Sequence, residues 1–318
     1  MKDGKSAGFS RKKPLAVMMS ARANVFYLQY AKVCLDGDRV VYWQKGQEID
    51  EMYNIPDKNT AFLLLGKGTS ITDAAVRALS ESGVVIGFTG TGGSPFFASS
   101  SPVFLETQSE YRPTEYMQAW VSMWIDEVQR LDVAKEFLRI RMELINRFWM
   151  KFYPAISIPE ALVQKFSAEI ASSPDTMNLL ICEAGWAKGL YATLANQLSM
   201  SKFTRVSGES GGDGDEAIKI TNSLLDHGNY IAYGYAAAAL TTLGISYAFP
   251  VLHGKTRRGA LVFDVADLIK DAIVMPLAFE AGKQGMKNSD FREILINRCW
   301  DYQILDILIE TIKKLSKK

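Results

Sequence analysis

The feature that most constrains the fold of this chain is a change of sequence texture about a third of the way along it. Up to residue 105, short runs rich in β-branched and aromatic residues alternate with turn-forming residues, which is typical of strands. From Tyr116 to Phe152, apolar residues recur at three- and four-residue spacing with charges between them, which predicts helix. We therefore expect an α+β protein with a small N-terminal β domain at residues 1–106 and a larger all-α-helical domain at residues 107–318.

Local patterns predict the individual elements of the two domains. Strands are expected at residues 16–19, 24–28, 39–43, 62–65 and 84–88, and one inserted helix at residues 70–82. After residue 152, further helices are expected at about residues 159–170, 177–198, 215–243, 265–284 and 290–315. The glycine-rich residues 207–214 predict a loop.

The charge balance excludes several classes of protein. The 318 residues include 36 Lys and Arg against 35 Asp and Glu, so the formal net charge is +1. Binding to DNA through bulk positive charge is therefore excluded, and any DNA contact must come from local basic patches. With 48% hydrophobic and 22% charged residues, the composition is that of a globular protein and not of a disordered one.

Neither disulfides nor membrane insertion is expected. The cysteines Cys34, Cys182 and Cys299 form no C-x-x-C pair, which argues against a disulfide framework and a structural zinc site. Residues 227–254 carry no Lys, Arg, Asp or Glu and are long enough to span a bilayer, but they include Gly, Asn and Pro. We interpret this run as an internal helix followed by a short extended piece. The basic N-terminus lacks a signal-length apolar stretch after it, and we expect a cytoplasmic protein.

Two glycine-containing segments resemble phosphate-binding loops in composition, but the spacing of their residues does not match the known motifs. Residues 65–70 follow an expected strand, yet they do not match G-x-x-x-x-G-K-[ST]. Residues 254–256 have the right ending, but Phe249 stands where the first glycine is required. A dinucleotide-binding G-x-G-x-x-G is also absent, because residue 71 is Ile. Both segments are interpreted as tight turns, which argues against a nucleotide-binding protein.

The strongest chemical signal lies at the end of the uncharged run. His253 is one of only two histidines, and eleven residues later an apolar strand-like run, Ala260–Phe263, leads to Asp264. Asp267 follows three residues on, a spacing that places both carboxylates on one face of a helix. One imidazole with several carboxylates suits Mg²⁺ or Mn²⁺, ions that serve in the hydrolysis and transfer of phosphodiesters. Helix capping is the alternative role for the two aspartates.

Three cations lie between the histidine and the first aspartate. Lys255, Arg257 and Arg258 are expected near the metal, where guanidinium geometry favours contact with a phosphate of DNA. The alternative is that they only counter the charge of the acidic cluster. We favour the phosphate role, because three cations exceed what two aspartates need.

Glu183 is the candidate for a further carboxylate of this site. It lies in the otherwise apolar helical stretch 179–184, where a lone carboxylate is costly unless it is paired or bound to a metal. From periodicity alone, we interpret Glu183 as an ordinary ion-pair residue, with Lys188 as the candidate partner.

A second polar group surrounds the other histidine. Asn222, Asp226 and Asn229 share one face of the helix expected there, by their four- and three-residue spacing. Asn222 and Asn229 could therefore face a site, but a buried hydrogen-bond network between helices is the interpretation that we prefer.

Five segments spread over nearly the whole chain also carry a resemblance to a known family, and the last of them is the most specific. They are SARANVFYLQ (20–29), LLLGKGTSIT (63–72), QSEYRPTEY (108–116), LDHGNYIAYG (225–234) and VLHGKTRRGALVFDVADLIKD (251–271). In these segments the chain resembles the CRISPR-associated adaptation integrase, Cas-one, of subtype I-F (Yersinia-type).

The resemblance implies a site and an assembly. It implies that the catalytic residues are Glu183, His253, Asp264 and Asp267, and that Glu183, His253 and Asp267 bind the metal, although it leaves open which aspartate is the direct ligand. We accordingly expect these side chains to converge on one Mg²⁺ or Mn²⁺ ion, and at least one clustered carboxyl to have a raised pKa without it. The family's fold is an N-terminal β domain and a C-terminal α-helical domain, paired into a homodimer through the β domains.

The resemblance also implies an activity. Members are metal-dependent DNA endonucleases and integrases that insert foreign DNA fragments as spacers at a CRISPR array. The 3′-hydroxyl of the fragment attacks a phosphodiester, and the reverse direction is a nuclease or disintegration activity. The implied partners are double-stranded and branched DNA and a Cas-two/Cas-three nuclease-helicase fusion. The alternative is a catalytically inert DNA-binding scaffold of the adaptation complex.

Overall fold

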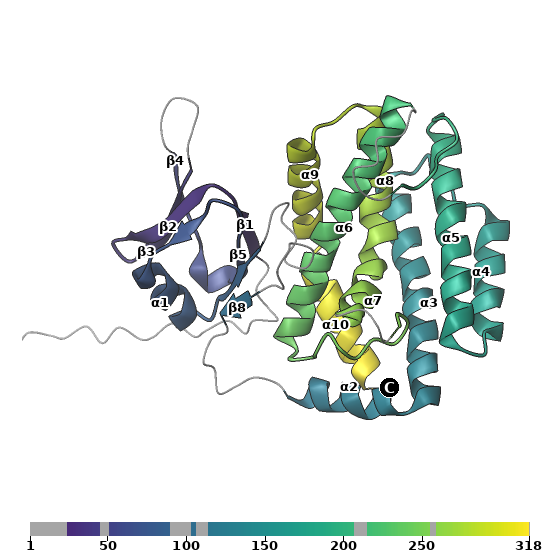
Figure 1. Ribbon diagram of the computed structural model, residues 1–318, viewed down its shortest axis with the longest axis horizontal. Coiled ribbons are helices and arrows are strands. Elements are labelled where there is room, and N and C mark those ends of the chain that lie inside the picture. The colour runs from purple at the N-terminus through teal and green to yellow at the C-terminus, as the bar shows by residue number, and fades with distance from the viewer. Residues whose placement is uncertain are drawn as a thin grey trace, which may run out of the picture.

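The computed structural model of the chain describes residues 24–44, 51–89, 103–105, 114–206, 215–254 and 259–317. A β-sheet part is followed by a larger bundle of helices (Figure 1), which confirms the expected α+β class. Within the described residues, no helix is both long and apolar enough to cross a membrane. The strand expected at 16–19, the loop expected at 207–214 and the domain boundary expected at 106–107 lie outside the described residues.

The first sheet forms the layer between the two parts. Its strands, in spatial order, are β1 (Asn24–Leu28), β5 (Thr60–Leu65), β7 (Val85–Phe88) and β8 (Val103–Leu105); the first three are parallel, and β8 is antiparallel to β7. Phe62 and Val85 pair across the sheet and belong to the core of the helical part, whereas their neighbours Leu63 and Ile86 belong to the core of the β part. Because side chains alternate along a strand, this one sheet contributes to both cores.

The second sheet lies on the far side of the β part. It contains β4 (Glu51–Asn54), β3 (Arg39–Gln44), β2 (Ala31–Asp36) and β6 (Ser70–Ile71), with a 3₁₀ turn (Asp57–Asn59) after β4. The β2–β3 turn uses the left-handed conformation of Gly37, at φ 59°. The inserted helix α1 (Asp73–Glu81) begins where the hydroxyl of Thr72 accepts a hydrogen bond from the Ala75 N–H.

The helical part packs around one long central helix. Its helices are α2 (Glu115–Ile125), α3 (Glu127–Phe152), α4 (Glu160–Ser172), α5 (Thr176–Gln197), α6 (Glu216–Thr242), α7 (Ala260–Ile269), α8 (Met275–Lys283), α9 (Asn288–Asp301) and α10 (Ile304–Ser316). Helix α6 contacts α7, α8 and α10, and its four consecutive alanines, 236–239, are all buried. The uncharged run 227–254 is therefore an internal helix and the segment that follows it, as expected.

Three expected helices are interrupted, and the one expected at 290–315 is divided into α9 and α10 at Tyr302 and Gln303, the latter with a φ of 51°. The helix expected from Tyr116 to Phe152 is divided at Asp126, whose extended backbone ends α2 and whose carboxylate caps α3 by accepting the N–H groups of Val128 and Gln129. The helix expected at 265–284 is divided by a π-helical turn, Lys270–Val274, between α7 and α8.

The expectation of a strand-like run at Ala260–Phe263 was wrong. These residues form the start of α7, directly after Gly259, which has a φ of 77°. All four are buried, and a short run that is apolar on every side has neither the period of a strand nor that of a helix. As a result, Asp264 and Asp267 lie within α7 and not at its N-terminus.

Candidate metal centre

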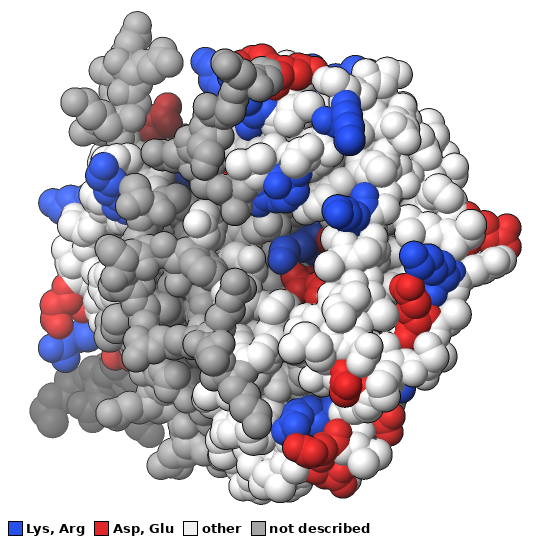
Figure 2. All heavy atoms as spheres, turned by 45° about the vertical axis from the view of Figure 1, so that its right-hand side comes forward, with Lys and Arg blue, Asp and Glu red and all other residues white. Residues whose placement is uncertain are grey.

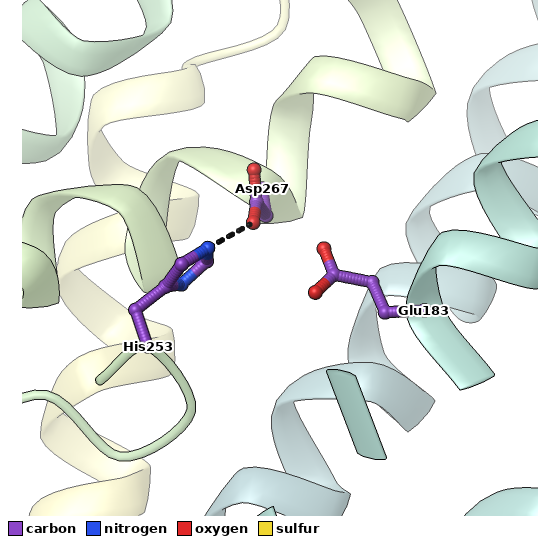
Figure 3. A group of neighbouring side chains, drawn as sticks. All are labelled: Glu183, His253 and Asp267. Carbon is purple, nitrogen blue, oxygen red and sulfur yellow. Dashed lines mark ion pairs between the residues drawn. The ribbon is translucent and has the colours of Figure 1, made fainter. Parts of the chain in front are cut away.

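Three segments that are distant in sequence bring Glu183, His253 and Asp267 together (Figure 3). Glu183 projects from α5, Asp267 from α7, and His253 from the segment between α6 and α7. Each residue offers one ligand atom, and these atoms lie within 4.8 Å of one another. Two ligand atoms that bind one divalent cation at about 2.0–2.4 Å lie at most twice that distance apart. The observed separations are therefore compatible with a shared ion. The structure thus brings together the three residues that were expected to bind metal.

Asp264 lies behind the histidine. Its carboxylate accepts the backbone N–H groups of Val251 at 2.8 Å, Leu252 at 3.2 Å and His253 at 3.0 Å. It also lies 2.6 Å from Nδ1 of His253, which leaves Nε2 directed towards Asp267, 4.0 Å from its Oδ2. A histidine that binds a metal through one nitrogen commonly donates from the other to a carboxylate. The geometry therefore gives the two aspartates different positions, with Asp264 orienting the imidazole and Asp267 facing Glu183.

Two cations that we did not single out from the sequence contact the carboxylates. Arg141 of α3 makes an ion pair with Glu183, and its Nη2 lies 2.6 Å from Oδ2 of Asp271. Lys270 donates to Oδ1 of Asp267 at 2.5 Å. Glu183 does form an ion pair, but its partner is Arg141 and not the suggested Lys188, because helices α3 and α5 pack side by side.

No local pattern marks Arg141, because it is one of several charges along α3. Asp271 carries a weak signal, since it stands four residues after Asp267 and thus on the same helical face.

Burial and these cations shift the pKa values of the carboxyl groups in opposite directions. Burial raises the pKa of Glu183 and that of Asp271, although Arg141 acts against the shift in both. Burial also opposes ionisation of Asp267, but Lys270, Arg141 and His253 together lower its pKa to about 2. At least one carboxyl therefore has a raised pKa, as expected, although burial contributes more to the shift than repulsion by the neighbouring carboxylate of Asp267. The neighbouring cations therefore stabilise the ionised form of Asp267.

The neighbours of His253 also shift the pKa of its imidazole. Burial disfavours its charged form, but the hydrogen bond to Asp264 and the charge of Asp267 outweigh burial and raise its pKa. The donor set of two carboxylates and one oriented imidazole fits Mg²⁺ or Mn²⁺.

The polar residues of α6 form a structural network. The side-chain oxygen of Asn222 accepts the Val206 N–H at 3.0 Å, and its nitrogen donates to the carbonyl of Thr204 at 3.1 Å. Arg205 bonds both Asn222 and Asp226. Asn222 thus ties residues 204–206 to α6, so the expected hydrogen-bond network exists, but it joins the helix to a non-helical segment and not to another helix. Asn229 is half-buried on the same helix.

Figure 2 shows acidic and basic side chains together in a recess near the middle of the face that it draws, with further Lys and Arg side chains above it. Lys255, Arg257 and Arg258, the expected phosphate-binding residues, lie outside the described residues.

Two carboxylates and one imidazole that converge within a helical domain form a donor set of Mg²⁺- and Mn²⁺-dependent enzymes, a class that includes enzymes acting on phosphodiesters. The family model for CRISPR-associated protein Cas1 matches residues 26–301, and the chain belongs to this family. A CRISPR-associated endonuclease Cas1 of Pseudomonas aeruginosa is 41% identical over 95% of both chains. That of Pectobacterium atrosepticum is 40% identical over 95% of this chain and 94% of its own.

Solved structures share the fold. A crystal structure of a TtCas1–DNA complex has a TM-score of 0.65 at 22% identity and covers 93% of this chain and 92% of its own. A casposase bound to an integration product has a TM-score of 0.67 at 15% identity and covers 92% of this chain and 90% of its own. At these identities the likeness extends to the fold alone.

Proposed function

We propose that this chain is a metal-dependent DNA endonuclease and integrase of CRISPR adaptation, which inserts foreign DNA fragments at a CRISPR array. The observation that carries the proposal is the convergence of Glu183, His253 and Asp267 from three separate segments. Family membership and the curated relatives named endonucleases, at 40–41% identity, support the same conclusion.

Glu183, Asp267 and Nε2 of His253 would hold Mg²⁺ or Mn²⁺. The ion supplies Lewis-acid polarisation of a phosphodiester and charge stabilisation during attack by a hydroxyl or water. Asp264 keeps the Nδ1 side of the imidazole occupied, so that the Nε2 lone pair is directed into the site. This arrangement fixes the ligand before substrate arrives.

The two resident cations assist the binding of an anionic substrate. Arg141 and Lys270 offset the negative charge of the carboxylates, which would otherwise repel the DNA backbone. We further propose that Lys255, Arg257 and Arg258 bind the phosphate next to the scissile bond, because they connect two of the ligand-bearing segments.

The finer assignments follow from the sequence resemblance. We propose that the protein belongs to subtype I-F, acts on double-stranded and branched DNA, and forms a homodimer through its β domain. Its expected protein partner is a Cas-two/Cas-three nuclease-helicase fusion. A catalytically inert DNA-binding scaffold is the competing function, and the resident cations that neutralise the carboxylates without a metal are the observation in its favour.

Cleavage and strand transfer on branched DNA separate the two functions. With Mn²⁺ or Mg²⁺ the wild-type protein should cleave and join, and EDTA should abolish both reactions. His253→Ala should lower the rate by roughly 100-fold or more while DNA affinity stays near wild type. The matched control is His227→Gln, which alters the other histidine and should retain activity. Absence of both reactions in the wild type, with DNA binding intact, would establish the scaffold function instead, whereas activity that persists in EDTA would contradict the metal-dependent mechanism.

A further inference from the structure

Arg141 is a buried arginine whose guanidinium contacts carboxylates from two directions. Its side chain is only 5% exposed. Nε and Nη2 bond Oδ2 of Asp271 at 2.7 and 2.6 Å. On the other side, Nη1 donates to Oε1 of Glu183 and lies 4.0 Å from Oδ2 of Asp267. One guanidinium thus connects two expected metal ligands to a carboxylate outside the ligand set.

The Asp271 end of this connection is firmly anchored. Asp271 lies in the π-helical turn and its side chain is 4% exposed. The indole N–H of Trp149, two turns after Arg141 on α3, donates to the backbone carbonyl of Asp271 at 3.0 Å. Helix α3 therefore holds this turn by both a side chain and a backbone group, and the guanidinium has little freedom to move.

On its other side, the guanidinium of Arg141 contacts Glu183, an expected metal ligand whose side chain is intrinsically flexible. A glutamate has three side-chain torsions, and ordering such a side chain costs conformational entropy. Among the described residues, Arg141 is the one side chain that donates a hydrogen bond to the Glu183 carboxylate. Asp271 engages Nε and Nη2 of the planar guanidinium, and this fixes the direction in which Nη1 points at Glu183. Nη1 thereby holds Oε1 and leaves the carboxylate beside the Asp267–His253 pair.

We propose that Arg141 is a positioning residue of the metal centre, which presets the Glu183 carboxylate for the cation by anchoring it to Asp271. This inference rests on the proposed function, because it assumes that Glu183, His253 and Asp267 bind a divalent ion. It assigns to α3, which carries no ligand, a role in metal affinity.

The competing role is neutralisation, in which only the positive charge of Arg141 matters. The two roles are distinguished by removing Arg141 and Asp271 together, in the double variant R141M/D271L. That change deletes one positive and one negative charge, so the net charge of the cluster is preserved while Glu183 loses its anchor. Replacement of a buried ion pair by apolar side chains is commonly tolerated.

Mn²⁺ affinity, measured by calorimetry and by the electron paramagnetic resonance signal of free Mn²⁺, is the readout. We expect R141M/D271L to fold, with a melting temperature in EDTA near that of the wild type, and to bind Mn²⁺ roughly 10–100-fold more weakly. Arg139→Met is the matched control, since Arg139 lies on the same helix, is half-exposed and pairs with Glu136; its Mn²⁺ affinity should stay within about twofold of wild type.

A folded double variant with wild-type Mn²⁺ affinity would overturn the proposal. If the double variant does not fold, Arg141→Lys provides the test, because it keeps the charge but not the fork. Weaker Mn²⁺ binding by folded Arg141→Lys supports positioning, and unchanged binding overturns it. Failure of the proposed function is a separate result, since the wild type would then bind no Mn²⁺ that depends on His253.

Discussion

At the scale of single residues, the two aspartates of α7 perform different tasks three positions apart. Asp264 is almost fully buried and satisfies three backbone N–H groups as well as the imidazole of His253. Asp267 accepts from Lys270 and faces Glu183. Substitution of either one should therefore affect folding and metal binding in different proportions.

We predict that Asp264→Asn lowers the free energy of unfolding in EDTA by about 1–3 kcal/mol, because a charged acceptor of buried N–H groups is lost. Mn²⁺ binding should also weaken, roughly 10–100-fold, because the imidazole is no longer oriented. Asp267→Asn should instead remove most of the Mn²⁺-dependent rise in melting temperature and leave the melting temperature in EDTA closer to that of the wild type. Thermal melts of both variants with EDTA and with Mn²⁺ check this, and the reverse ranking in EDTA would contradict it.

At the scale of elements, α3 holds together the helices that carry the ligands. In Figure 1 it runs between α5 and the α7–α8 segment, and it contacts both. Its buried Arg141 is the cation that faces Asp271 and Glu183. Burial disfavours its charge, but the surrounding carboxylates prevail and raise its pKa above the ordinary value.

We predict that Arg141→Met alone lowers the free energy of unfolding by about 3–5 kcal/mol, because it leaves Asp271 buried without its cation. R141M/D271L should recover most of this loss, since neither charge remains. Urea unfolding in EDTA at neutral pH measures both variants. Equal destabilisation by the single and the double change would show that the arginine contributes through packing and not through its charge.

At the scale of the whole molecule, Arg292 of α9 joins the β part to the helical part. Its Nη1 donates to Oε1 of Gln29, just after β1, at 3.1 Å. Its Nε donates to Nε2 of His227 on α6 at 3.2 Å. The contact borders a mostly apolar cavity between the two parts, lined in addition by Val25 and Ile231. His227 must therefore be neutral in order to accept the hydrogen bond from Arg292 at this junction.

This junction predicts a pH dependence of stability. Burial, with a contribution from Arg292, lowers the pKa of His227 from 6.5 to about 4. The unfolded chain therefore binds one more proton at this residue between about pH 6.5 and 4, and stability falls as the pH falls through that window. In His227→Gln, the amide oxygen can still accept from Arg292. The slope of the unfolding free energy against pH should therefore decrease, by up to the amount that corresponds to one bound proton. Urea unfolding between pH 4.5 and 7 tests it, and identical slopes for the two proteins would contradict it.

The sequence alone determined that a β-sheet part is followed by a helical part. It also determined those residues of the site that lie close together along the chain. Strand-forming runs and helical periodicity act over a few residues, so the α+β class was predictable from them. His253, Asp264 and Asp267 span only fifteen residues, so their proximity to one another is largely a local property of the sequence. The start of α7 at Ala260 was not predictable, because its first four residues are all apolar.

Only the tertiary structure decided which charges meet. Arg141 stands 42 residues before Glu183 and 130 before Asp271, and the packing of α3 against α5 and the π-helical turn brings them together. Periodicity shows which face of a helix is buried but not which helix covers it, and a charge on that face has no identified partner until the helices are packed. The different positions of Asp264 and Asp267 were decided in the same way, because the backbone N–H groups that surround Asp264 belong to a segment whose course depends on the whole bundle.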